Sequence, residues 1–116
     1  MSKRLARVQK LARTVLGEAI QDLKDPRVGF ATVTAVRITP DLRHAKVFVS
    51  VLGDEDERAA TMAGLRSARS HLRGVLGQEV RFKYLPELDF ELDTSPEEAV
   101  RLEGIINKLH HDEEEE

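Results

Sequence analysis

The chain has 116 residues, 41% of them hydrophobic and 34% charged, a balance typical of one globular domain with a charged surface. It contains no cysteine, which excludes disulfides, a cysteine nucleophile and a thiolate zinc site. No apolar run reaches the ~20 residues that cross a bilayer, so we expect a soluble, cytoplasmic protein without a membrane partner.

The net charge of -3 averages over two parts of opposite charge. Residues 112–116 are all acidic, and taking these five from the 21 acidic residues leaves 16, against 18 basic ones. The sequence therefore predicts a mildly basic single domain over residues 1–110. A disordered acidic tail is predicted over residues 111–116.

Residues 5–23 carry apolar side chains at the three-and-four spacing of an amphipathic helix. With about 100° per residue, the basic side chains of this segment fall on the opposite half, and no acidic residue occurs before Glu18. The basic residues are Lys3, Arg4, Arg7, Lys10 and Arg13. Two interpretations stay open for them: a solvated helix face, or a surface that binds RNA phosphates.

Residues 25–52 predict a β-hairpin whose arms are separated by Pro40 and Asp41. The second arm alternates apolar and polar residues from Ala45 on, which predicts one buried face. In the first arm the apolar residues change phase between Val33 and Val36, which predicts a β-bulge near residues 34–35.

The acidic run at residues 54–57 predicts a helix start, with Asp54 as N-cap and Glu57 three residues on. A helical apolar pattern follows toward Gly77, where we expect the helix to end. Serines in mid-helix predict a kink near residues 68–70. Three arginines within about 60° of one another form a second basic surface on this helix. They are Arg66, Arg69 and Arg73.

Residues 80–92 alternate in one phase and predict the third strand, interrupted at Pro86. Arg81 and Lys83 near its start extend the basic surface. Ser95 and Pro96 then predict the start of a short C-terminal helix.

Aromatic residues make up only 4% of the chain. Phe30, Phe48, Phe82 and Phe90 all fall in predicted strands, where we expect them in the core, and Tyr84 is the single tyrosine. RNA binding would therefore depend on phosphates and shape, with little support for base stacking.

Four segments of the chain are distinctive in their order and spacing: DPRVGF at 25–30, PDL and AKVFVS within 40–50, VLGDE at 51–55 and YLPELDFELD at 84–93. Through these segments the chain resembles the bacterial ribosome-binding factor A family over nearly its whole length. The resemblance implies an α+β domain of the type II KH-like class, with the order α-β-β-α(kink)α-β. It also implies a three-stranded mixed sheet packed on helices, with a short C-terminal helix added.

The same resemblance implies a non-catalytic ribosome biogenesis factor. It would bind the free 30S subunit and its 16S rRNA and assist late maturation, including processing of the rRNA 5′ end. Ribosomal proteins and other assembly factors are further candidate partners, and we expect a monomer without cofactor or metal.

The family replaces the G-x-x-G loop of KH domains by an Ala-x-Gly kink. This motif maps onto Ala68, Arg69 and Ser70, so serine stands where glycine is usual. The expected RNA-binding residues are therefore the basic residues named above together with Ser70.

Two other classes of function are conceivable for this sequence. An enzyme could use His44 near Asp41, or His71, but neither histidine is accompanied by a nucleophile motif or a phosphate-binding glycine loop, so we expect no catalysis. The alternative is a protein-binding module that engages ribosomal proteins through the acidic tail and residues 54–57. Salt and nuclease treatment separate it from RNA binding, because phosphate contacts weaken with salt and disappear with the RNA.

Overall fold

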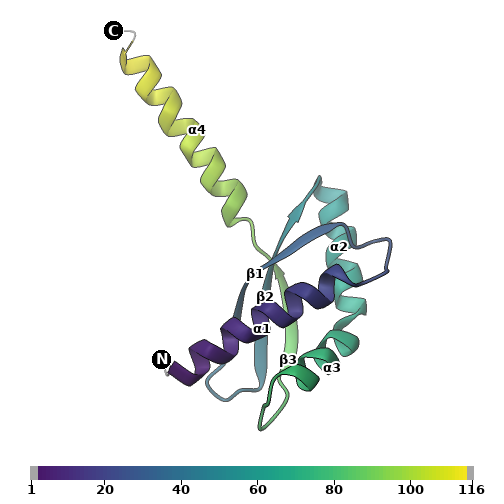
Figure 1. Cartoon of the computed structure of the whole chain (residues 1–116). Coiled ribbons are helices and arrows are strands. Elements are labelled where there is room, and N and C mark those ends of the chain that lie inside the picture. Colours follow the sequence, from purple (N-terminus) through teal and green to yellow (C-terminus); the bar gives the residue numbers. More distant parts are fainter. Residues whose placement is uncertain (1–2, 115–116) are drawn as a thin grey trace.

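The computed structural model describes the backbone of residues 3–114. This part of the chain folds in the expected order and has a type II KH-like α+β architecture (Figure 1). Its elements are α1 (Lys3–Gln21), β1 (Phe30–Ile38), β2 (His44–Leu52), α2 (Glu55–Ser67), α3 (Arg69–Glu79), β3 (Glu87–Leu92) and α4 (Ser95–Glu114).

The strands form a mixed sheet in the order β1-β2-β3. β1 and β2 pair antiparallel as the predicted hairpin, and β3 lies parallel to β2. Val33 pairs with Val49 while Ala35 pairs with Phe48, so Thr34 is the extra residue of a bulge at the predicted place. Because the bulge shifts the phase of β1 by one residue, Val33 and Val36 can both be buried.

One face of the sheet is buried beneath α1, α2 and α3 (Figure 1). The alternating residues Ala45, Val47, Val49 and Val51 of β2 lie at its centre, as predicted. The helices contribute fully buried leucines to the same core. These are Leu16, Leu65, Leu72 and Leu76. The aliphatic core fixes α1 across β1 and against α3, which decides where the basic residues of α1 lie.

The predicted kink separates α2 from α3. Ala68 stands between them with φ -88° and ψ 5°, and its N–H still bonds to the carbonyls of Gly64 and Leu65, both at 3.1 Å. Among the described residues the only non-glycine with positive φ is Leu42, so the bend does not require a left-handed residue at Ser70. Serine at position 70 is therefore compatible with the bend.

The third strand is shorter than predicted. α3 continues past Gly77 to Glu79, and the N–H of Val80 still bonds to the Leu76 carbonyl. Residues 81–86 form a loop, hereafter the 81–86 loop, and β3 begins only at Glu87, whose N–H reaches the Arg43 carbonyl at 2.8 Å. The alternation at residues 80–84 resembled a strand, but these residues have no neighbouring strand to pair with. Pro86 has no N–H to donate to a ladder.

α4 has 20 residues and is longer than the short helix expected (Figure 1). It extends away from the sheet and includes residues 111–114 of the predicted acidic tail, while residues 115–116 lie outside the described part. Between residues 3 and 114, no helix is both long and apolar enough to span a bilayer.

Candidate nucleic-acid interface

The basic residues of α1 all point away from the core. Lys3, Arg4, Arg7, Lys10 and Arg13 are exposed, whereas Ala12 and Leu16 on the opposite face are fully buried. We call Arg4, Arg7, Lys10 and Arg13 the α1 band. Side chains three residues apart on an α-helix differ in direction by about 60°, because three residues fall that much short of a full turn. Arg4 and Arg13 are separated by three such steps, so they lie about 180° apart, at the two flanks of the exposed face.

Hydrogen bonds to β1 fix α1 in place. β1 is an edge strand, and an edge strand leaves backbone groups without a ladder partner. The Oε1 atom of Gln9 accepts from the N–H of Ile38 at 2.8 Å, and Gln21 Nε2 donates to the carbonyl of Ala31 at 3.1 Å. Arg13 Nε donates to the Val33 carbonyl at 3.4 Å. The α1 band therefore lies on a helix that is fixed along the sheet edge.

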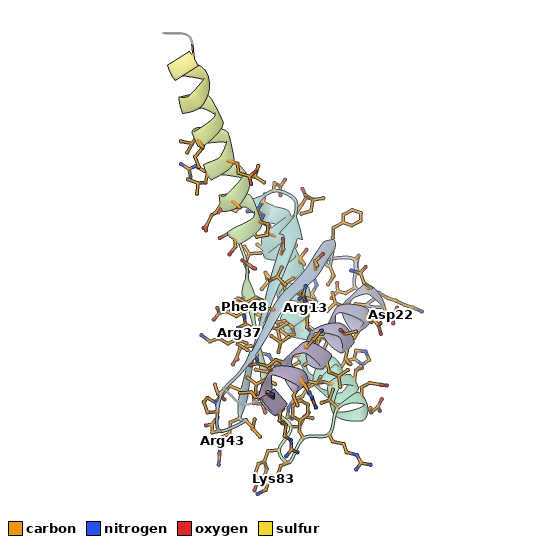
Figure 2. All side chains as sticks on the ribbon, turned by 60° about the vertical axis from the view of Figure 1, so that its left-hand side comes forward. Arg13, Asp22, Arg37, Arg43, Phe48 and Lys83 are labelled. Atoms are coloured by element: carbon orange, nitrogen blue, oxygen red, sulfur yellow. The ribbon has the colours of Figure 1, made fainter. Side chains whose placement is uncertain are left out.

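At one flank, the α1 band continues onto the sheet. Lys10 and Arg13 line a shallow groove together with Arg37 of β1, beside the bulge at Thr34 (Figure 2). Arg37 is exposed, and sequence analysis did not select it. The available signal was its place three residues after Thr34, on the exposed phase of β1.

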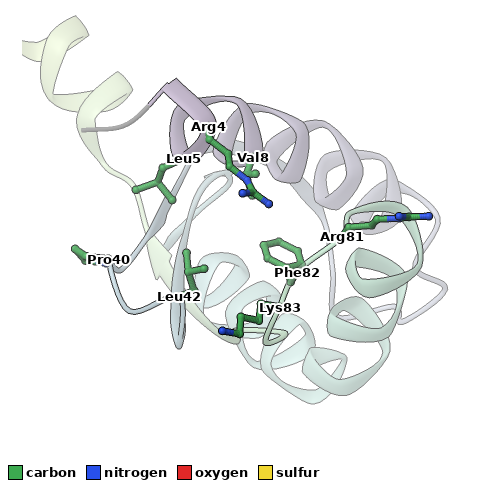
Figure 3. A pocket seen from close by; sticks show the side chains of 8 residues that line it. All are labelled: Arg4, Leu5, Val8, Pro40, Leu42, Arg81, Phe82 and Lys83. Atoms are coloured by element: carbon green, nitrogen blue, oxygen red, sulfur yellow. The ribbon is translucent and has the colours of Figure 1, made fainter.

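At the other flank, the α1 band meets the 81–86 loop. A hollow of about 350 Å³ opens between the start of α1, the β1–β2 hairpin loop and the 81–86 loop (Figure 3). We call it the Phe82 hollow. Arg4, Arg81 and Lys83 surround it, and Leu5, Val8, Leu42 and Phe82 supply its apolar lining. The structure thus brings Arg81 and Lys83 next to α1, although they are far from it in the sequence.

The hairpin loop that forms one wall of the Phe82 hollow is itself hydrogen-bonded. The Asp41 carboxylate accepts from the Thr39 hydroxyl at 2.6 Å and from the Arg43 N–H at 3.1 Å. The Thr39 hydroxyl, followed by the Arg43 N–H, holds the pKa of Asp41 below its ordinary value, because both donors stabilise the charged form. Asp41 is therefore ionised at neutral pH and acts as an acceptor within the loop.

The arginines of α2 and α3 form a less open surface than predicted. Arg66 is exposed, but Arg69 and Arg73 are only partly exposed. Arg73 Nε donates to the Pro86 carbonyl at 3.0 Å, Nη2 donates to the Leu85 carbonyl at 2.7 Å, and Glu87 lies 3.3 Å from the same group. Its guanidinium closes the 81–86 loop onto α3. Leu85 and Pro86 are distant from Arg73 in the sequence and come within its reach only in the folded protein.

Arg69 and Ser70, at the start of α3, differ in their surroundings. The Nε of Arg69 is buried and has no hydrogen-bond partner among the described residues, whereas Ser70 is exposed. A role for these residues in RNA binding stays a prediction.

The aromatic residues also differ from expectation. Phe90 is buried in the core as predicted, but Phe30 is 80% exposed. Tyr84, for which no burial was predicted, is 62% exposed. Phe82 packs against the core as expected, but from a loop that also lines a hollow, because the third strand begins at Glu87 and not at residue 80.

Ion pairs in the described part of the chain lie away from the α1 band. They join Arg27 to Asp25, Lys46 to Glu91 and Arg73 to Glu87. Arg7 and Lys10 take part in none of these pairs, so their charge remains available to a ligand. Exposed cations without nearby acids are what phosphate binding requires.

The histidines considered for catalysis lie apart from one another. His44 is exposed on β2, with its Nδ1 3.4 Å from Asp89, and His71 is exposed on α3. Within residues whose side chains are described, no group of three or more His, Asp or Glu residues could hold a metal ion.

Comparisons with known proteins agree with this fold. Residues 4–106 match the family model of ribosome-binding factor A. A relative in Chloroflexus aggregans, named ribosome-binding factor A, is 44% identical over 112 residues, which cover 95% of this chain and 88% of the relative.

Solved structures of similar proteins superpose well. The crystal structure of ribosome-binding factor A from Thermus thermophilus is 33% identical with a TM-score of 0.68, over 76% of this chain and 94% of that one. A homology model of the Thermus thermophilus factor, fitted into a cryo-EM map of its complex with the 30S subunit, is 29% identical with a TM-score of 0.63. That match covers 82% of this chain and 97% of that one.

Proposed function

The chain belongs to the ribosome-binding factor A family, and on that premise we propose that it binds the free 30S ribosomal subunit as a non-catalytic assembly factor. Its ligand on the subunit is the 16S rRNA, contacted mainly through phosphates. A cytoplasmic location follows from this partner. The complex of a related protein with the 30S subunit supports the choice of particle.

The α1 band is the observation that carries the proposal. Its cations are exposed, take part in none of the ion pairs among the described residues, and lie on a helix fixed to the sheet edge. Because the helix is already fixed in place, phosphate binding to these cations requires no further ordering of the backbone. The band extends to Arg37 at one flank and to Arg81 and Lys83 at the other, so it can follow several phosphates of one strand.

Binding is tested by co-sedimentation with purified 30S subunits and with intact ribosomes, at low and moderate salt. We expect association with free 30S subunits alone, and a linear fall of log affinity with log salt. In the double variant Arg7→Glu/Lys10→Glu, affinity falls and the salt slope decreases by about one unit for each phosphate that is no longer bound.

A matched control reverses two exposed cations outside the α1 band, as Lys24→Glu/Arg101→Glu, with the same change in net charge. If both double variants lose affinity equally, net charge alone is responsible and the α1 band is not the site. If neither particle binds the unmodified chain, the proposal fails for this protein.

The proposed role in late maturation includes processing of the 16S rRNA 5′ end. In cells that lack the protein, precursor rRNA with an unprocessed 5′ end is expected to accumulate, measured by primer extension. The unmodified chain restores processing and Arg7→Glu/Lys10→Glu does not. If the 5′ ends are normal in cells that lack the protein, the proposed role in rRNA processing fails and only the proposed binding to the 30S subunit stands.

The alternative, a module that binds ribosomal proteins through acidic surfaces, has less support. Asp54 accepts from the Glu57 N–H at 2.8 Å and Glu57 accepts from the Asp54 N–H at 3.3 Å, so these acids form a capping box for α2. Association that survives nuclease digestion of the rRNA would favour the alternative.

A further inference from the structure

We infer that the Phe82 hollow receives one unpaired nucleotide of the bound RNA, with the base against Phe82 and the adjacent phosphates at Arg4, Arg81 and Lys83. The inference deepens the proposed function and rests on it, because the RNA must be bound before one of its nucleotides can enter. It adds a base contact to a surface that otherwise offers only phosphate contacts.

The hollow has the size and chemistry of a small-ligand site. Its volume of about 350 Å³ falls within the range of about 300 to 1,000 Å³ that such sites occupy. Its lining is largely apolar, with Arg4, Arg81 and Lys83 as its cationic members, and Figure 3 shows the Arg81 side chain directed outward from the hollow. A planar base joined to a charged phosphate matches that combination.

Phe82 and Arg4 define where the base would lie. Figure 3 shows the two side chains directed toward one another across the hollow, one from the 81–86 loop and the other from the first turn of α1. Phe82 is half-buried and packs against the core, so its ring is held in place. A fixed aromatic ring and a guanidinium both stack on bases, which makes this pair a platform for one nucleotide.

Leu42 supplies an independent observation. It is the only non-glycine residue with positive φ in the described part of the chain, at 62°, a conformation that glycine or asparagine adopts more readily. Its N–H bonds to the Thr39 carbonyl at 2.8 Å, and its side chain lines the hollow (Figure 3). Backbone strain of this kind concentrates at ligand-binding positions, and here it places an apolar side chain in the wall of the hollow that the hairpin loop forms.

An acidic peptide with an apolar side chain is the competing occupant, and the surrounding charge favours RNA. Arg4 belongs both to the hollow and to the α1 band, which continues through Arg7 and Lys10. A nucleic acid strand carries a phosphate at every residue, so one strand can occupy the hollow and the band together.

The experiment is ultraviolet cross-linking of the protein to 30S subunits, with the cross-linked residue located by mass spectrometry. We expect a nucleotide attached at Phe82. Phe82→Leu keeps an apolar side chain and should lose the cross-link, with affinity for 30S subunits falling about 5- to 100-fold, as expected when one base no longer stacks. Phe82→Tyr keeps the aromatic ring and should retain both the cross-link and the affinity for 30S subunits.

Phe30→Leu is the matched control, because it removes an exposed aromatic residue of β1 that does not line the hollow. It should leave affinity and the Phe82 cross-link unchanged. Thermal melting of each variant verifies that it is folded at the assay temperature.

The outcomes separate the two proposals. Absence of 30S binding by the unmodified chain overturns the proposed function together with this inference. Normal binding with cross-links elsewhere, and with unchanged affinity of Phe82→Leu, overturns the inference alone. A cross-link to a ribosomal protein instead of rRNA at Phe82 would assign the hollow to a peptide and would likewise overturn it.

Discussion

The side-chain amide of Gln9 in α1 accepts a 2.8 Å hydrogen bond from the backbone N–H of Ile38 in β1, and both residues are buried. Gln9 thereby satisfies a donor at the unpaired edge of the sheet. Since a buried N–H without a partner costs free energy, this contact fixes both the position and the rotation of α1. The rotation determines that Arg4 faces the Phe82 hollow and Arg13 faces the bulge.

Replacement of Gln9 by leucine should destabilise the protein. Gln9→Leu leaves the Ile38 N–H buried without its acceptor, and we expect the free energy of unfolding to fall by about 1 to 3 kcal/mol. Urea denaturation followed by circular dichroism measures this change. Gln78→Leu, at an exposed glutamine of α3, is the control and should change stability by less than about 0.5 kcal/mol. Equal effects would show that the Gln9 hydrogen bond is dispensable.

Replacement of Arg73 should lower the stability of the fold rather than remove a direct contact to RNA. Arg73→Ala removes the donors to the carbonyls of Leu85 and Pro86, and we expect the free energy of unfolding to fall by about 1 to 3 kcal/mol. Arg66→Ala, at an exposed arginine, is the control. If Arg73→Ala retains full stability and yet binds 30S subunits less tightly, the structural role of Arg73 is contradicted.

The charge of Arg37 should contribute to binding. Arg37→Glu reverses an exposed cation beside Lys10 and Arg13, and we expect weaker 30S binding with a salt slope about one unit smaller. Co-sedimentation at several salt concentrations measures both quantities. Arg101→Glu on α4 carries the same change in charge and should behave like the unmodified protein. An unchanged slope for Arg37→Glu would place the RNA elsewhere.

The bend between α2 and α3 should not depend on whether serine or glycine stands at position 70. Ser70→Gly introduces the residue usual in the family, but this position lies in the first turn of α3, and the bend is made at Ala68. Glycine loses more backbone entropy than serine when it enters a helix, so we expect stability to fall by up to about 1 kcal/mol. Thermal melting measures the change. A gain in stability would indicate that serine strains the kink.

Acid should weaken the contact between Asp93 and the bulge of β1. The Thr34 hydroxyl, which donates to Asp93 at 2.6 Å, and then the donors of Ser95 lower the pKa of this carboxyl below its ordinary value. A carboxyl whose pKa is lower in the folded state stabilises the fold above its unfolded pKa. That contribution is lost as pH falls through the folded pKa.

Urea denaturation at pH 7 and near pH 3 tests the contribution of Asp93. Asp93→Asn should be less stable than the unmodified protein at pH 7, and the difference should shrink toward pH 3. Thr34→Val, which removes the first donor, should reduce the effect of Asp93→Asn when the two are combined. A difference that stays constant with pH would mean that the charge of Asp93 does not matter.

Much of the fold could be predicted from sequence patterns between neighbouring residues. The phase change between Val33 and Val36 predicted the bulge, and Asp54 with Glu57 predicted the capping box of α2. The kink at Ala68 and the exposed basic face of α1 were predicted in the same way. Each of these features depends on side chains a few residues apart, so the chain itself encodes them.

The candidate site was only partly predictable. The start of β3, the loop contacts of Arg73 and the place of Arg37 beside Arg13 depend on residues that are distant in the chain. Alternation at residues 80–84 is compatible with a strand or a loop, and only the absence of a pairing strand decides between them.

The sequence by itself determined the order of the elements, the bulge, the kink and the cations of α1, because local periodicity and capping fix which face of each element is apolar. The tertiary structure alone decided that Arg4 and Phe82 face the same hollow and that Arg73 is bound within the fold. The physical reason is that long basic and aromatic side chains find partners according to the packing of whole elements. That packing results from the shared core, which no single segment specifies.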